Sequence, residues 1–388
     1  MRILLVNDYV DQGGGAELQV KLLRDALRAR GHDVRVFASA AGDPPRAAAD
    51  ELCFGTLTAL RTPLQAANPS AALRLRQVLG RFRPDVVHVR MFLSQLSPLI
   101  LTALRSVPAI WHIVWYRAVC PRGTLLRLDG SDCEHRTGAA CLREGCVSAR
   151  AWVPAMVQHR LLQRGVGSFD RVVAVSESMR ARLGRAGFEV ADVLRNGVTE
   201  RPARPPLGSP PTVAFAGRLV PEKGADLLLR AFASLGGDAR LLICGDGPER
   251  PRLAALAGEL GVAERVELTG ALSPDDLERR IARAWVHTMP GRWVEPFGNA
   301  GAEALMRGTA LVASTPGGAA ELVVESGAGA TLPRGDVTAL RAALAERLAD
   351  RERCEAEGAR GRAWALENLR HDDHVARVEA LYREVTRR

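Results

Sequence analysis

Short β-rich apolar runs alternate with helical stretches along the 388 residues, and this alternation limits the possible folds more than any other feature. In the first half, such runs occur at Ile3–Val6, Val34–Phe37, Val86–Val89, Ala109–Val114 and Val172–Val175. Helical stretches lie between them, such as Ala16–Arg30, Leu73–Phe82, Leu96–Leu104 and Ser176–Arg185. Near-continuous apolar strands separated by helices are typical of a parallel sheet covered on both faces. We therefore expect an α/β chain of doubly wound sheets.

The alternation starts again after a proline-rich segment. Residues 199–211 hold five prolines in 13 positions, which excludes a helix or a central strand and predicts a linker. Apolar runs follow at Thr212–Ala216, Leu241–Cys244, Val266–Thr269, Ala284–Met289, Ala310–Ala313 and Ala330–Leu332. We expect two Rossmann-like domains facing across a cleft. They cover residues 1–198 and 212–370, and a last helix, about 371–388, is able to pack back on the first.

Composition excludes several classes of protein. The longest apolar runs are far too short to span a bilayer, and the N-terminus lacks a signal-peptide pattern. We therefore expect a cytoplasmic protein whose seven cysteines are thiols or metal ligands more than a disulfide framework.

The positive charge is concentrated in the first half. Residues 1–195 carry 27 lysines and arginines against 17 aspartates and glutamates, within a net charge of +9 for the chain. Such a half can attract an anionic membrane, which would place the protein peripherally at the inner face, or a phosphorylated or anionic substrate. Scattered arginines without an aromatic stacking run or zinc-finger spacing argue against nucleic acid. A merely solvated basic surface is the alternative.

Glu295 and Glu303 lie on either side of a turn that leads from a strand into a helix starting near Gly298. At about 3.6 residues per turn, Glu303 lies on a helix face that can look back toward Glu295. The first-turn N–H groups of the helix provide an anion site beside the two carboxylates. The pair predicts a nucleotide-sugar site, and a capped amphipathic helix with solvated carboxylates is the alternative.

Arg218 and Lys223 lie in a loop that directly follows the strand Thr212–Ala216. Ligands of open parallel sheets bind at the carboxyl ends of strands, where this loop lies. Lysine occurs only at positions 21 and 223, so its use in this loop indicates a phosphate contact more than an ordinary surface loop.

A glycine run, Gly13-Gly14-Gly15, occupies the matching place after the first strand. Glycines allow a ligand to approach the backbone closely at a helix N-terminus, although neither the dinucleotide fingerprint nor the Walker A pattern is present. No Asp-x-Asp pair occurs, so nothing in the sequence points to a metal–diphosphate clamp.

Several phrases together resemble the retaining glycosyltransferases of family 4, which have the GT-B architecture. They are Gly-Arg-Leu-Val-Pro-Glu-Lys-Gly-Ala-Asp (217–226), Gly-Asp-Gly-Pro-Glu (245–249), Glu-Pro-Phe-Gly-x₄-Glu (295–303), Gly-Gly-Ala-Ala-Glu (317–321), Gly-Gly-Gly-Ala-Glu (13–17) and Arg-Gly-His-Asp-Val (30–34). The resemblance spans nearly the whole chain and is strongest in the second half.

The resemblance implies roles for individual residues. Arg218 and Lys223 would bind the donor diphosphate, helped by N–H groups around Gly298 and Asn299. Glu303 would hold the ribose hydroxyls and Glu295 a hydroxyl of the transferred sugar. Gly14 and Gly15 would lie near the phosphates.

His112 resembles the active-site histidine of the family, near the transferred sugar. The usual aspartate after it is replaced by Ile113, which puts an acid/base role of that neighbour in doubt. A structural histidine at a strand end is the alternative.

Four cysteines, Cys120, Cys133, Cys141 and Cys146, fall within one stretch of weak secondary-structure signal. Their spacing matches no standard zinc knuckle, so a structural zinc, free thiols and disulfides all stay open. We expect the loop to shape an acceptor pocket.

We therefore predict a retaining, metal-independent, hexosyltransferase-type enzyme of polysaccharide biosynthesis. It would need no cofactor and would use a nucleoside diphosphate sugar and a glycan, lipid-linked or small-molecule acceptor. Catalysis would rest on Glu295, His112, Arg218 and Lys223. The alternatives are a nucleotide-sugar epimerase or hydrolase on the same fold, and a non-catalytic nucleotide-sugar-binding subunit.

Overall fold

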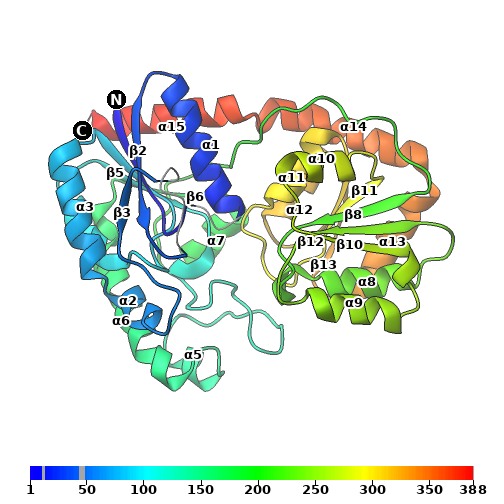
Figure 1. Ribbon diagram of the computed structural model, residues 1–388, viewed down its shortest axis with the longest axis horizontal. Coiled ribbons are helices and arrows are strands. Elements are labelled where there is room, and N and C mark those ends of the chain that lie inside the picture. The colour runs from blue at the N-terminus through cyan, green and yellow to red at the C-terminus, as the bar shows by residue number, and fades with distance from the viewer. Residues whose placement is uncertain (11–13, 43–48, 388) are drawn as a thin grey trace. The chain divides into compact units, whose positions relative to one another are not determined.

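The computed structural model describes residues 1–10, 14–42 and 49–387, which form two compact units (Figure 1). Unit 1 comprises Met1–Gly197 and Asp372–Arg388, and unit 2 comprises Val198–His371, including the proline-rich segment. None of the helices in these ranges has the length and apolar character that a bilayer-spanning segment needs.

Unit 1 is built on a parallel sheet that has seven strands in the described ranges, in the order β3-β2-β1-β4-β5-β6-β7. The strands are β1 (Arg2–Val6), β2 (Asp33–Ser39), β3 (Glu51–Cys53), β4 (Val86–Val89), β5 (Ala109–Ile113), β6 (Arg171–Ala174) and β7 (Asp192–Val193). Its α-helices are α1 (Gly15–Ala29), α2 (Arg61–Ala66), α3 (Pro69–Phe82), α4 (Leu101–Leu104), α5 (Ala139–Arg143), α6 (Ala149–Gly165), α7 (Glu177–Arg185) and α15 (His371–Thr386).

Helix α15 completes the core of unit 1 although it is the last element of the chain. Val375, Val378 and Tyr382 are fully buried against Ile3 and Val86, which belong to the central strands. Each such side chain contributes about 1.5–3 kcal/mol when it is removed from water, so this helix is an integral part of the unit.

Unit 2 has a six-stranded parallel sheet in the order β10-β9-β8-β11-β12-β13. The strands are β8 (Thr212–Ala216), β9 (Arg240–Cys244), β10 (Val266–Gly270), β11 (Val286–Met289), β12 (Ala310–Thr315) and β13 (Gly329–Pro333). The α-helices are α8 (Ala225–Ala233), α9 (Arg250–Glu259), α10 (Pro274–Ile281), α11 (Asn299–Arg307), α12 (Gly318–Ser326), α13 (Val337–Ala349) and α14 (Arg351–Asn368).

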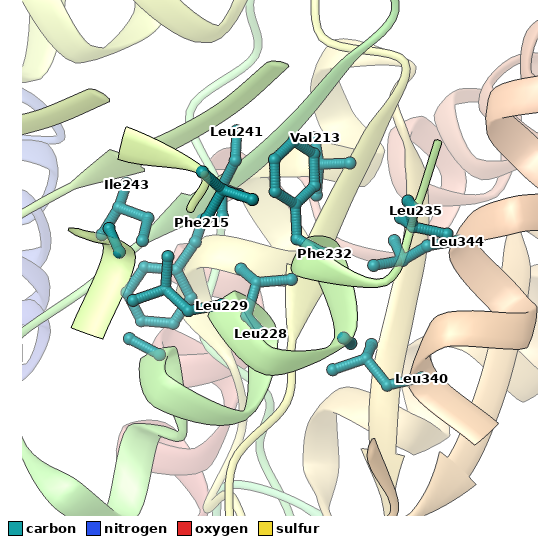
Figure 2. Close-up of a cluster of buried hydrophobic side chains, with 14 of the residues drawn as sticks. Val213, Phe215, Leu228, Leu229, Phe232, Leu235, Leu241, Ile243, Leu340 and Leu344 are labelled. Carbon is teal, nitrogen blue, oxygen red and sulfur yellow. The ribbon is translucent and has the colours of Figure 1, made fainter. Parts of the chain in front are cut away.

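The core of unit 2 fixes both ends of the loop that carries Arg218 and Lys223. Leu228, Leu229 and Phe232 of α8 pack against Phe215 of β8 and Ile243 of β9 (Figure 2). Because the strand before the loop and the helix after it are both anchored in this cluster, the loop has little freedom to move away from the sheet edge.

Most predicted elements are found, and the exceptions have local causes. The single helix expected over Leu96–Leu104 is wrong: Ser97 takes a left-handed conformation with φ of 66°, a 3₁₀ turn follows at Pro98–Ile100, and α4 starts only at Leu101. The helix capped by Ser273 is confirmed, because its hydroxyl accepts the Asp276 N–H at 3.1 Å.

Candidate functional site

The strand order of unit 2 places the predicted donor residues at one edge of the sheet. The order reverses between β8 and β11, which pair directly. Arg218 and Lys223 follow β8, and Glu295 follows β11, so all three lie beyond the carboxyl ends of adjacent strands. This reversal is where doubly wound sheets bind their ligands.

Lys223 and Glu295, 72 residues apart in the chain, form an ion pair. The Lys223 Nζ lies 2.8 and 3.1 Å from the two carboxylate oxygens, and the side chains are 20% and 14% exposed. The Trp293 indole N–H donates to the same carboxylate at 2.9 Å, and the Lys223 Nζ lies 4.9 Å from the Trp293 ring centroid. The ammonium group is therefore held in place yet reaches solvent, where an anion can contact it.

A second ion pair ties the two loops together. The Arg292 guanidinium donates to both carboxylate oxygens of Asp226, at 2.6 and 2.7 Å, and the Arg292 backbone N–H donates to the backbone carbonyl oxygen of Glu222 at 2.9 Å. Burial alone would raise the pKa of Asp226, but the hydrogen bonds and charge of Arg292 hold it below the usual value. These contacts thus tie the loop after β8 to the loop after β11.

Arg218 differs from these residues because it is exposed. Within the described ranges it makes no ion pair with a carboxylate, so its five N–H donors stay available. A guanidinium in this state can engage two phosphate oxygens in one plane.

The segment Gly245-Asp246-Gly247 packs directly against the backbone of the loop that carries Arg218. A Cβ on Gly245 would lie 1.9 Å from the Gly217 oxygen, and one on Gly247 would lie 2.4 Å from the Leu219 oxygen. Both glycines also have positive φ, at 144° and 156°. Glycine is required here because two backbone segments meet without room for a side chain.

Two helices begin beside Glu295 without a side-chain cap. Helix α11 follows Gly298, which has a φ of 96°, and α12 follows Gly317. The Gly318 N–H donates to the backbone carbonyl oxygen of Glu295 at 2.7 Å, which holds the start of α12 against the loop after β11. First-turn N–H groups and the helix dipoles together favour a negative group at this point.

Glu303 lies within α11, and burial raises the pKa of its carboxyl group while Arg307 and Arg201 act in the opposite sense. It makes no hydrogen bond or ion pair with any residue that the structure describes. A half-buried carboxylate without a protein partner is suited to accept hydrogen bonds from ligand hydroxyls.

In unit 1, the glycine run marks the start of helix α1. Gly13 lies outside the described residues, whereas Gly14 is the N-cap and Gly15 the first helical residue. The N-cap glycine has no side chain to cap the helix, and the Glu17 carboxylate of the first turn lies close by, since a Cβ on Gly14 would be 2.2 Å from its oxygen.

His112 lies inside the sheet of unit 1 and not at its surface. Its side chain is fully buried, 5.7 Å from His88 and 6.5 Å from His374 between ring centroids. Burial, followed by the charge of Arg90, lowers the pKa of His112 well below the usual value, so the ring is neutral near pH 7. Its neighbour Ile113 has no acidic group.

The cysteine segment contains one short helix, α5, which the sequence did not predict. Cys120, Cys133, Cys141 and Cys146 are all free thiols. Burial is the largest cause of the raised pKa of Cys133 and Cys141, and the other thiols of the segment add to it. No group of three or more histidines, cysteines, aspartates or glutamates is arranged to hold a metal ion among the residues that the structure describes. The structural zinc considered from the sequence stays a prediction.

Trp293, Arg292 and Asp226 were not predicted from the sequence as site residues. Asp226 ends the phrase 217–226 and Trp293 lies two positions before Glu295, so both were within reach of the motifs. The contacts among them join segments more than 60 residues apart, and no spacing rule predicts such contacts.

Two family models match consecutive parts of the chain: Glycosyltransferase Family 4 over residues 13–201 and Glycosyl transferases group 1 over residues 199–364. A GDP-mannose-dependent alpha-(1-6)-phosphatidylinositol monomannoside mannosyltransferase of Mycolicibacterium smegmatis is 30% identical, over 98% of this chain and 97% of that one. A glycogen synthase of Mycobacterium tuberculosis is 28% identical, over 90% and 86% of the two chains.

Solved structures share the fold. A sucrose-phosphate synthase from Thermosynechococcus elongatus superposes with a TM-score of 0.77 at 21% identity, covering 99% of this chain and 98% of its own. Anabaena HepE in complex with UDP and glucose gives 0.71 at 18%, covering 99% and 100%.

The architecture is therefore GT-B, and the protein is a glycosyltransferase. The chain belongs to glycosyltransferase family 4.

Proposed function

We propose that the enzyme is a retaining, metal-independent glycosyltransferase that moves a sugar from a nucleoside diphosphate sugar to an acceptor hydroxyl. One observation carries this proposal. Lys223, held by Glu295, and Arg218, which has no carboxylate partner in the described chain, lie with the N-termini of α11 and α12 at the point where the strand order of unit 2 reverses. These groups supply the positive charge that a diphosphate leaving group requires.

The proposal assigns donor binding to unit 2. Arg218, Lys223 and the N–H groups around Gly298 and Asn299 take the diphosphate. Glu303 accepts the ribose hydroxyls, because its carboxylate has no protein partner in the described chain. Glu295 accepts a hydroxyl of the transferred sugar when the diphosphate draws Lys223 away from it.

Unit 1, comprising residues 1–197 and the final helix, takes the acceptor. We assign Gly14 and Gly15 to a phosphate contact through the first-turn N–H groups of α1. The burial of His112 within the sheet leads us to give it no contact with the transferred sugar in this proposal.

The chemical step needs a stabilised leaving group more than a nucleophilic side chain. The bond from the anomeric carbon to the phosphate oxygen breaks as the acceptor oxygen bonds the same face. The acceptor proton passes to the departing phosphate. Arg218, Lys223 and the helix N-termini stabilise the negative charge that develops on that oxygen, and this accounts for a reaction without a metal clamp.

The mannosyltransferase relative guides the choice of donor. Because it is 30% identical along nearly the whole chain, GDP-mannose is the first nucleoside diphosphate hexose to test. A donor that binds the native protein raises its melting temperature, by the equivalent of about 2.7 kcal/mol at 100 times the dissociation constant. We expect one donor of a panel to do so, and to be consumed only when an acceptor is present. Consumption at the same rate without an acceptor would identify a hydrolase or epimerase instead.

We further propose that the acceptor side meets an anionic membrane. Phe54, Leu57 and Leu60 are 53%, 57% and 62% exposed in the segment between β3 and α2, and Arg61 follows them directly. Apolar side chains next to cations suit the interface of an acidic bilayer. The protein should sediment with vesicles containing acidic lipid, and Leu57→Glu/Leu60→Glu should abolish this. If that variant sedimented with the vesicles as well as the wild type does, the exposed apolar residues would have no role and the basic surface alone would explain the binding.

A further inference from the structure

A cavity of about 760 Å³ opens in unit 1 beside the cysteine segment, which the sequence predicts to shape an acceptor pocket. None of the residues proposed above for donor binding lines it. Its walls are helices α6 and α7 and the segment 119–139 that follows β5. The volume is within the range of small-molecule sites, which is about 300–1,000 Å³.

The charged groups of the cavity are strongly unbalanced. Arg136, Arg160, Arg182 and Arg185 line it, against one carboxylate, Glu134. Burial lowers the pKa of His159, so this cavity residue is neutral near pH 7 and the arginines provide the charge. A concave site with this excess draws anions toward it.

None of the four arginines has a carboxylate partner among the residues that the structure describes. Arg182 donates to the Cys133 oxygen at 2.5 Å, which ties α7 to the cysteine segment and fixes one wall. Arg136, Arg160 and Arg185 form no ion pair within the part of the chain that the structure describes. Several guanidinium groups that line one cavity from separate elements suit a tetrahedral phosphate, which offers oxygens in several directions.

The remaining wall is apolar. Leu125, Trp152 and Met156 line it, and the Trp152 indole N–H donates to the Gly138 oxygen at 3.1 Å, which fixes the ring. An apolar wall beside guanidinium groups favours an anion that carries an organic body over a bare ion.

We propose that this cavity binds a phosphate monoester of a small organic molecule, at a second anion site separate from the diphosphate grip of unit 2. Arg160 and Arg185, on different helices, contact the phosphate from two sides, and Trp152 packs against the body of the ligand. This site goes beyond the proposed transfer reaction, because its occupation does not require the donor.

The test is a calorimetric titration of the full chain with glycerol 3-phosphate, and with glycerol as the uncharged counterpart. Arg160→Gln/Arg185→Gln should lower the affinity at least tenfold, and glycerol should not bind. The matched control is Arg150→Gln/Arg164→Gln, which removes the same charge from α6 outside the cavity and should stay within twofold of the wild type. All four side chains are exposed, so the variants should keep the wild-type melting temperature.

Unchanged affinity in the cavity variant overturns the proposal. An equal loss in both double variants also overturns it, since a diffuse basic surface would then explain the binding. Neither result depends on transfer activity, so failure of this site and failure of the proposed reaction can be told apart.

Two sources of the phosphate ester are distinguished by kinetics. If the ester belongs to the acceptor, glycerol 3-phosphate should raise the acceptor KM at constant kcat. If it is a separate ligand, kcat should change without competition against the acceptor. In both cases Arg160→Gln/Arg185→Gln should remove the effect, and an effect that persists in this variant contradicts the proposal.

Discussion

Replacing Lys223 with alanine is expected to lower kcat by about 10²–10³-fold, the usual loss when one donor to a developing anion is removed. Lys223 is the only lysine of unit 2 and is positioned by the Glu295 carboxylate at 2.8 Å and by the Trp293 ring. Without it, the leaving diphosphate loses a cation that no neighbouring side chain replaces. Steady-state kinetics with saturating donor measures the effect.

The chain offers a matched control, because its only other lysine is Lys21 on the exposed side of α1. Lys21→Ala should keep normal turnover. Lys223→Ala should also keep its melting temperature within a few degrees, since the ion pair is partly exposed and Glu295 retains the Trp293 N–H. Near-normal turnover in Lys223→Ala would refute the assignment.

The largest loss of stability is expected for Glu357→Ala in unit 2. The Arg347 guanidinium is completely buried and donates to both oxygens of Glu357, each at 2.8 Å, which joins α13 to α14. Removing the carboxylate leaves an uncompensated buried cation, which costs about 3–5 kcal/mol. Chemical denaturation, followed by a probe of unit 2, measures this change.

Glu346→Ala is the control for this variant. Glu346 also lies near Arg347, at 3.9 Å, but its side chain is 54% exposed. An exposed pair contributes at most about 1 kcal/mol. If Glu357→Ala and Glu346→Ala lowered the free energy of unfolding equally, the buried Arg347–Glu357 pair would not stabilise unit 2 more than an exposed pair does.

The main elements of the fold were predictable because apolar runs and caps are local signals. The strand Thr212–Ala216 and the final helix agree with β8 and α15, and Ser273 was identified as an N-cap from its neighbours alone. The two edge strands of unit 1 escaped prediction because they are so short: β3 has three residues and β7 has two. The helix α6 was also missed, since Pro154 interrupts its pattern.

Only those features of the site that local sequence motifs encode were predictable. The loop of Arg218 and Lys223 was placed correctly at the end of β8, because strand ends are visible in the sequence. The pairing of Lys223 with Glu295 was not, because it depends on the order of strands in the sheet. The position of His112 shows the same limit, since the strand that contains it was predicted but the burial of its side chain was not.

The central claim is that unit 2 holds a diphosphate through Lys223, Arg218 and the start of α11. A crystal structure with the nucleoside diphosphate of the active donor tests it most directly. We predict phosphate oxygens within hydrogen-bonding distance of the Lys223 Nζ, the Arg218 guanidinium and the first N–H groups of α11. A diphosphate bound elsewhere, with Lys223 still paired to Glu295 and no phosphate near it, would contradict the account.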